Sequence, residues 1–277
     1  MRVAGSESVR PERKARPGKI ASIAALAFLG YRVTAQVEPP TPSELIARAI
    51  AVRKAQDDRG WKYTYREDHS NAQLDTNGKT EPPVTRTYDH IMLEGSEYKK
   101  LVLIDGKPLD AKTQKKVDED LERTRTERQK HHLLSVTRTV DVSDLDQLEK
   151  YFDNKVTGEE TVLGRRTWRM ESDPKPDYKM SDNKDREYLA SRHTSWFDEQ
   201  EGWRIKWRDL FVRDAKGFQP GSVIDWEMAP VGDAWLFDNI AFRVDMKIVL
   251  GIHGRGESHQ HFYDYKRFTV DSTMTPE

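Results

Sequence analysis

The chain of 277 residues contains no cysteine, which excludes disulfide cross-links and thiol chemistry. It also lacks the lipid-modified cysteine on which a bacterial lipoprotein anchor depends. Hydrophobic residues are scarce at 36%, yet the net charge is only −1, and nine Phe, seven Trp and ten Tyr are present. Disordered chains combine low hydrophobicity with high net charge and few aromatics. We therefore expect a folded chain with a polar exterior.

Long apolar runs are also missing, and no stretch reaches the 18 or so residues that a membrane-spanning helix needs. The apolar run Ile20–Tyr31 follows a basic segment and precedes Val33-Thr34-Ala35, which has small residues at the positions of a cleavage site. We predict a signal peptide at residues 1–35 and one soluble, exported domain at residues 36–277. A buried amphipathic N-terminal helix is the alternative.

Motifs for nucleophilic hydrolysis, phosphate binding and dinucleotide binding are absent. No cofactor is therefore expected, and we predict a protein that is not an enzyme. Without residues 1–35 the chain has 39 basic and 45 acidic side chains, and such an acidic surface argues against nucleic acid as a partner. A hydrolase with an unpatterned carboxylate site stays open as a third interpretation.

Three helices are indicated by caps and periodicity. Thr41, Pro42 and Glu44 form a capping-box pattern ahead of a helix that ends near Gly60. Asp110 is a plausible N-cap for a highly charged helix that reaches about residue 134. A shorter helix is predicted from Ser143 to Phe152.

The rest of the chain alternates polar and apolar residues, which predicts about ten or eleven strands. Because helices do not alternate with these strands, the fold class is α+β with a large antiparallel sheet. So wide a sheet twists until it curls. We therefore predict an unclosed half-barrel, with about three helices on the concave side and a groove between sheet and helices. The sequence leaves open which strand faces are concave.

Aromatic residues concentrate on the faces of several predicted strands. The candidates for an apolar ligand-binding wall are Trp61, Tyr63, Tyr65, Trp203, Trp207, Trp226 and Phe242. A concave, apolar, preformed cleft is the usual form of a small-molecule site. Ordinary core packing is the alternative, because strand aromatics bury area with or without a ligand.

The histidines near the last strand are candidate metal ligands. His259 and His261 lie on the same side of that strand, with His253 and Glu257 close in sequence. A zinc site needs three or four ligands, and the spacing fixes only two imidazoles. We favour a polar strand end and predict no metal site.

The order of elements resembles that of the periplasmic outer-membrane lipoprotein-sorting proteins, the LolA/LolB-like family. The resemblance spans roughly Ser43 to Ser272. It rests on the strings Leu93-Glu94-Gly95-Ser96-Glu97-Tyr98-Lys99-Lys100-Leu101, Asp105-Gly106-Lys107-Pro108-Leu109 and His261-Phe262-Tyr263-Asp264-Tyr265-Lys266-Arg267-Phe268. It implies an unclosed β-barrel in the periplasm, with helices as a lid, that holds the acyl chains of lipoproteins in transit.

Two functions follow as expectations. The first is a non-enzymatic periplasmic carrier or binding protein that shelters an acyl chain or lipoprotein lipid moiety in an apolar groove. The alternative is a structural or interaction module of the cell envelope, whose groove is filled by its own side chains and which binds a protein partner.

Overall fold

The structure is a computed structural model of the chain. It describes residues 38–58, 62–73, 81–130, 143–178, 188–215, 218–248 and 252–268. The predicted signal peptide, residues 1–35, lies outside the described residues, as does Trp61. From Pro39 onward the chain forms one compact unit.

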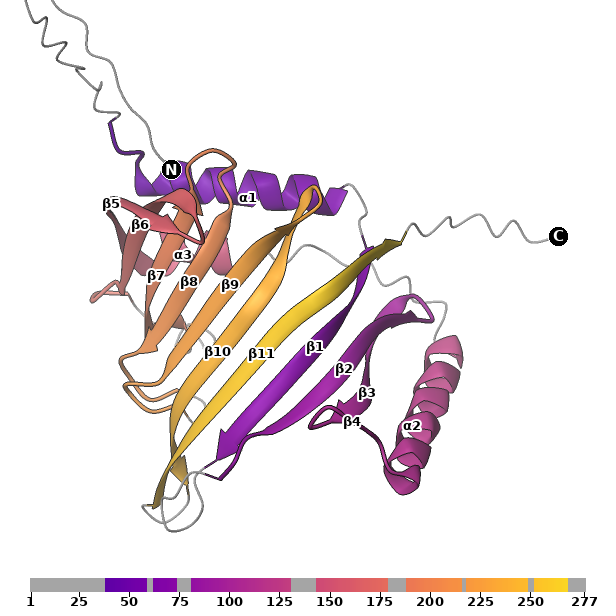
Figure 1. Cartoon of the computed structure of the whole chain (residues 1–277). Coiled ribbons are helices and arrows are strands. Elements are labelled where there is room, and N and C mark those ends of the chain that lie inside the picture. Colours follow the sequence, from indigo (N-terminus) through magenta and orange to yellow (C-terminus); the bar gives the residue numbers. More distant parts are fainter. Residues whose placement is uncertain are drawn as a thin grey trace, which may run out of the picture. The chain divides into compact units, whose positions relative to one another are not determined.

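The described residues form a single antiparallel sheet of eleven strands, in the order β4-β3-β2-β1-β11-β10-β9-β8-β7-β6-β5. Strands that are neighbours in sequence pair with each other, except β4 and β5, and β1 also pairs with β11 in the middle of the sheet. The edge strands β4 and β5 do not pair with each other, so the sheet is not closed (Figure 1). The prediction of an α+β fold with an unclosed half-barrel is confirmed.

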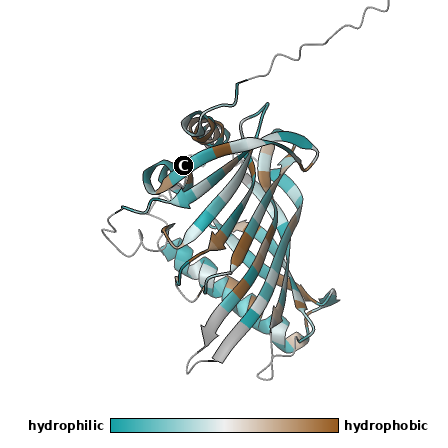
Figure 2. Cartoon of the chain, turned by 90° about the vertical axis from the view of Figure 1, so that its left-hand side faces the viewer, coloured by the Kyte–Doolittle hydropathy of each residue, from teal (hydrophilic) through white to brown (hydrophobic). Residues whose placement is uncertain are grey.

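The strands are β1 (Lys62–Gln73), β2 (Val84–Leu93), β3 (Ser96–Ile104), β4 (Lys107–Pro108), β5 (Phe152–Val162), β6 (Arg165–Pro174), β7 (Ser191–Asp198), β8 (Arg204–Phe211), β9 (Val223–Val231), β10 (Ala234–Ile248) and β11 (Ile252–Phe268). Hydrophilic and hydrophobic segments alternate along these strands (Figure 2). This alternation is the pattern that predicted them, because successive side chains of a strand point to opposite faces.

The three helices are α1 (Pro42–Asp58), α2 (Ala111–Lys130) and α3 (Ser143–Tyr151). The capping box predicted for α1 is present: the Thr41 amide donates to Glu44 Oε2 at 2.7 Å, and the Glu44 amide donates to Thr41 Oγ1 at 3.3 Å. Asp110 Oδ1 accepts from the amides of Lys112 and Thr113, each at 2.9 Å. Both predicted N-caps are therefore confirmed.

The main core lies where α1 and α3 cover one part of the sheet. Leu45, Ile46 and Ala49 of α1 pack with Leu145 and Leu148 of α3 against residues of β5, β6 and β7. Figure 1 shows α1 lying across one end of the sheet. The helices do not cover β9, β10, β11 and β1 in the same way. There, a second cluster of three buried residues, Ile224, Ile240 and Phe262, is ringed by half-buried aromatics.

Helix α2 contacts the face of the sheet opposite to the one that α1 and α3 cover. Glu97 lines the cavity described below, whereas the next residue, Tyr98, donates its hydroxyl to Asp120 of α2 at 2.8 Å. Neighbouring residues of a strand point to opposite faces, so α2 is not on the concave side with α1 and α3. The α2 sequence is too polar to bury a face, and none of its residues is buried.

No helix in the described part of the chain is long and apolar enough to cross a membrane.

Candidate functional site

A cavity of about 940 Å³ lies between the sheet and the two helices α1 and α3. Its wall includes Met92 and Glu97 of β2 and β3, and also Ser191 and His193 of β7. In the sheet order, β7 is six spacings from β2 and seven spacings from β3. In a flat sheet β3 and β7 would lie roughly 34 Å apart at about 4.8 Å per spacing. The sheet must therefore curve to bring both sets of residues to one space.

Aromatic side chains make up much of the wall. Those that line the cavity are Tyr63, Tyr65, Phe152, Tyr188, Trp203, Trp207, Phe211, Phe218, Trp226, Trp235, Phe237, Phe262 and Tyr265. The indoles of Trp207 and Trp226 stack with centroids 5.4 Å apart and planes 11° from parallel. The centroid of the Phe237 ring lies 6.1 Å from that of Trp207 and 6.0 Å from that of Trp226. The stacked pair forms a flat apolar floor of the kind that binds alkyl chains or rings.

The structure brings five of the seven predicted wall residues to this cavity: Tyr63, Tyr65, Trp203, Trp207 and Trp226. Phe242 does not line the cavity, but it is on the same face of the sheet and its ring contacts that of Trp226 edge-on, with centroids 6.2 Å apart. Trp61 lies outside the described residues. The role of the seven predicted wall residues in ligand binding remains a prediction.

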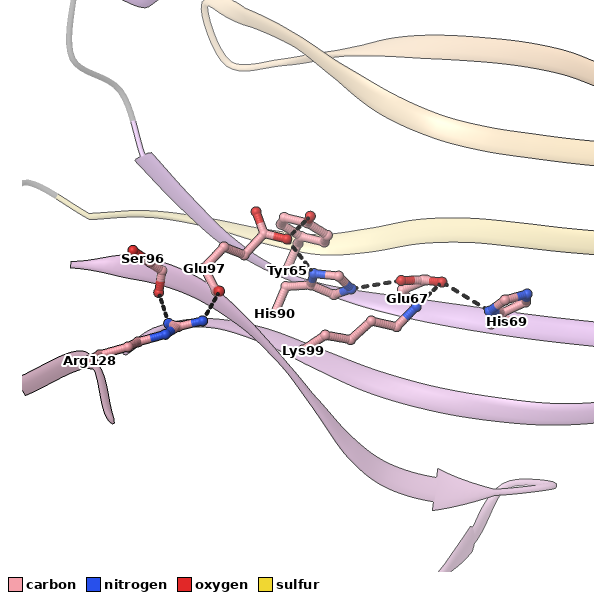
Figure 3. A network of polar contacts seen from close by, with 8 residues as sticks. All are labelled: Tyr65, Glu67, His69, His90, Ser96, Glu97, Lys99 and Arg128. Carbon is pink, nitrogen blue, oxygen red and sulfur yellow. Dashed lines mark hydrogen bonds and ion pairs between the residues drawn. The ribbon is translucent and has the colours of Figure 1, made fainter. Parts of the chain in front are cut away.

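A buried polar cluster on β1, β2 and β3 lies at the cavity edge (Figure 3). His90 is central: its Nε2 lies 2.7 Å from Glu67 Oε2, and its Nδ1 lies 2.8 Å from Glu97 Oε1. Lys99 Nζ donates to Glu67 Oε1 at 2.7 Å, and the Tyr65 hydroxyl donates to Glu97 Oε1 at 3.0 Å. Tyr65 also stacks on the His90 ring with centroids 4.2 Å apart. The cluster thus joins the aromatic wall to three strands.

The charges of this cluster shift the titration of its members. Burial disfavours the His90 imidazolium, but hydrogen bonds and charge from Glu67 and Glu97 outweigh burial and raise the pKa of His90. Burial likewise opposes ionisation of Glu67, yet its hydrogen bonds with His90 and Lys99 lower the pKa of that carboxyl. Burial, and then the charge of Glu97, raises the pKa of Tyr65. The arrangement favours an imidazolium held between two carboxylates.

Two further polar groups interrupt the apolar wall. His193 Nδ1 lies 2.6 Å from Asp209 Oδ1, and the indole of Trp226 donates to Asp209 Oδ2 at 3.0 Å. Arg53 of α1 donates to Asp144 Oδ1 at 3.1 Å, and Arg204 of β8 donates to the other oxygen of the same carboxylate. These pairs place charge inside an otherwise aromatic space.

Sequence reasoning missed these polar groups. The signal that was available is weak: Glu67 and His69, or His193 and Thr194, read only as polar positions on alternating strands. Their meaning depends on cross-strand register. The pairing of His193 with Asp209, for example, exists because β7 and β8 align at those two residues.

The histidines of the last strand show no metal-binding arrangement in the described part of the chain. No group of three or more His, Asp or Glu that could hold a metal ion occurs among the described residues. His261 stacks on Tyr263 with centroids 5.4 Å apart, and its Nδ1 lies 3.2 Å from Asn239 Oδ1. The side chain of His253 lies outside the described residues.

No protein family matches the chain, and no curated protein sequence matches it. Solved structures do match. A DUF1329 family protein from Desulfovibrio piger is 11% identical, with 84% of this chain and 95% of that chain covered, at a TM-score of 0.36.

Two other matches have names of the predicted kind. A putative outer membrane lipoprotein-sorting protein domain from Vibrio parahaemolyticus is 11% identical, covers 83% of this chain and 94% of that chain, and has a TM-score of 0.35. A LolA superfamily protein from Nitrosomonas europaea is 10% identical, with 86% of this chain and 99% of that chain covered, at a TM-score of 0.31. The names of these structures agree with the resemblance drawn from the sequence. At such TM-scores they carry no argument about the ligand or partners of this chain.

Proposed function

We propose that this protein is a non-enzymatic carrier or binding protein that shelters an acyl chain, or the lipid moiety of a lipoprotein, in the cavity between the sheet and helices α1 and α3. The single observation that carries the proposal is the aromatic-lined space of about 940 Å³. Small-molecule sites have volumes of about 300–1,000 Å³ and mostly apolar walls. The cavity matches both properties.

The alternative was a groove filled by the protein's own side chains. The volume of the cavity and the half-buried state of Trp226, Phe237 and Tyr265 favour a space that is left for a ligand. The cavity is partly open to solvent, and a preformed concave cleft with a mostly apolar wall is the usual form of a small-molecule site.

We also propose how the protein reaches its compartment and where it acts. Residues 1–35 would direct export and be removed, and residues 36–277 would act as a single soluble domain in the periplasm, with no lipid anchor. An envelope protein that delivers or receives the lipid would be the partner. Helix α1 would act as part of a lid, because its contacts with the sheet outside the core are polar and few: Gln56 bonds to the backbone of Trp235, and Arg48 bonds to backbone oxygens of Glu199 and Gln200.

A titration with a fluorescent fatty acid tests the proposal, read both by probe emission and by quenching of the protein's tryptophans. The variant Met228→Trp places a larger side chain in the cavity wall, next to the Trp226 position along β9. We expect it to weaken binding of a 16-carbon probe more than that of an 8-carbon probe. Trp196→Phe is the control, because Trp196 bonds Glu160 and does not line the cavity. Equal weakening by both variants, or no binding by the unaltered protein, would refute the proposal.

A further inference from the structure

The cavity holds an arginine whose charge is incompletely matched. The side chain of Arg204 is only 7% exposed, and its guanidinium lies 4.2 Å from the centroid of the Trp207 ring. An arginine has five N–H donors. The contacts of Arg204 with other described residues use one of them, in the bond to Asp144. No nitrogen of Arg204 is among the fully buried side-chain atoms of the described residues that lack a partner, and Arg204 lines the cavity, so its remaining N–H groups are accessible to a ligand there.

Its counter-ion is shared. Asp144 accepts from Arg53 through one carboxylate oxygen and from Arg204 through the other. Two positive charges therefore face one negative charge. Arg53 and Asp144 are 35% and 41% exposed, whereas Arg204 is 7% exposed, so the charge of Arg204 is the least screened by water of the three.

The other carboxylates that line the cavity have partners of their own. Asp209 is held by His193 and by the Trp226 indole, and Glu97 is held by His90 and the Tyr65 hydroxyl. These two carboxylates therefore do not neutralise Arg204.

A buried side-chain oxygen of Gln147, which also lines the cavity, has no hydrogen-bond partner among the described residues. A terminal amide can turn to present either its oxygen or its nitrogen.

We infer that the ligand is an amphiphile with an anionic head group, a carboxylate or a phosphate, which binds Arg204 and Arg53 while its chain lies on Trp207 and Trp226. This inference rests on the proposed function and names the class of ligand. Guanidinium groups bind carboxylates and phosphates through charge-assisted, often bidentate, hydrogen bonds. The stacked indoles adjoin Arg204 directly, so head and chain positions are continuous.

The test compares three ligands with the same 12-carbon chain, dodecanoate, dodecyl phosphate and dodecanol, each below its critical micelle concentration. Inorganic phosphate and acetate serve as bare anions. We expect the two anionic amphiphiles to bind at least about tenfold more tightly than the alcohol, since a hydrogen bond to a charged group has that order of effect. The bare anions should bind far more weakly than either.

Variants then separate recognition from structure. Arg204→Met keeps an apolar stem over Trp207 and should remove the preference for anions while leaving dodecanol binding within about twofold. Asp144→Asn removes the shared counter-ion and should strengthen binding of the anionic ligands, which a purely structural role for Asp144 would not produce. Arg208→Met is the control, because Arg208 is on the same strand but bonds Asp225 on the opposite face.

Equal binding of dodecanol and dodecanoate, or an equal loss of all three ligands in Arg204→Met, would overturn the inference and leave the proposed function intact. Bare phosphate that binds as tightly as dodecyl phosphate would also overturn it, because the site would then recognise a free anion. Failure of all three amphiphiles to bind would overturn both.

Discussion

His90 and Glu67 form a buried ion pair at the cavity edge, with Nε2 of the imidazole 2.7 Å from Oε2 of the carboxylate. Glu67 is only 2% exposed, and both nitrogens of His90 face carboxylates. A neutral imidazole can donate from one nitrogen only. The geometry is therefore fully satisfied only when His90 is protonated.

This pair predicts a specific dependence of stability on pH. The pKa of His90 is raised above its ordinary 6.5, so its contribution is complete below that pH and is lost as pH rises through the folded-state pKa. The pKa of Glu67 is lowered below its ordinary 4.5, so its contribution is present above that pH and is lost as pH falls. We expect the cluster to stabilise the fold most between these values. Urea unfolding at several pH values measures this.

Replacing Glu67 tests the contribution of the His90–Glu67 pair to stability. Glu67→Gln leaves His90 and Lys99 without their shared carboxylate, and removing one partner of a buried pair costs roughly 3–5 kcal/mol. Because Lys99 is partly exposed, the lower end of that range is expected. The fall in stability above pH 6.5 should also become smaller, although Glu97 still raises the pKa of His90 in this variant. Unchanged stability, or an unchanged slope there, would show that the pair does not form.

Gly202 should tolerate substitution poorly for two reasons. Its φ is +79°, which L-residues with a Cβ rarely adopt, and an added Cβ would lie 2.5 Å from Cγ of Arg48. Gly202→Ala should therefore lower the free energy of unfolding by roughly 2–3 kcal/mol. Gly232→Ala is the control: its φ is +64°, but nothing lies within 4 Å of the added atom, so only about 1 kcal/mol is expected. Equal losses in thermal denaturation would contradict the packing of Arg48 against Gly202.

Gln56 should control how readily the cavity opens. Its side chain accepts from the Trp235 amide at 2.8 Å and donates to the Trp235 carbonyl oxygen at 3.2 Å, which ties the end of α1 to β10. Gln56→Ala removes both bonds, and each contributes about 1 kcal/mol. We expect the bound probe to dissociate several-fold faster, measured by stopped-flow displacement. Gln114→Ala, in α2, removes a bond to Asp118 and should leave that rate unchanged. A rate that is the same in all three proteins would argue against α1 as a lid.

Local signals predicted much of the fold. The capping residues Thr41 and Asp110 were identified from short motifs, and β2 was predicted at Val84–Leu93, as observed, because its apolar alternation is bounded by polar segments. The two-residue strand β4 has no such pattern. The first half of β11 was also missed, because Gly254 and Gly256 and its polar residues give no apolar alternation. The helix predicted to about residue 134 is described as far as Lys130, and residues 131–142 lie outside the described ones.

The site was less predictable because it depends on long-range register and on curvature. Trp207 and Trp226 could be assigned to apolar faces, but their stacking requires the alignment of β8 with β9 at those residues. Arg204 and Asp144 are 60 positions apart and come together only through the packing of α3 on the sheet. Which face is concave is set by the sheet as a whole. The side of the sheet that α2 would contact therefore could not be derived from its own sequence.

The most direct test of the proposed function is mass spectrometry of the protein purified from its native cells without added lipid, first intact under non-denaturing conditions and then after lipid extraction. We expect a protein peak carrying a lipid of defined mass, which is lost on extraction and reduced in Met228→Trp. A protein that is free of lipid in both measurements, and stays so after incubation with membrane lipids, would contradict the claim that the cavity exists to hold an acyl chain.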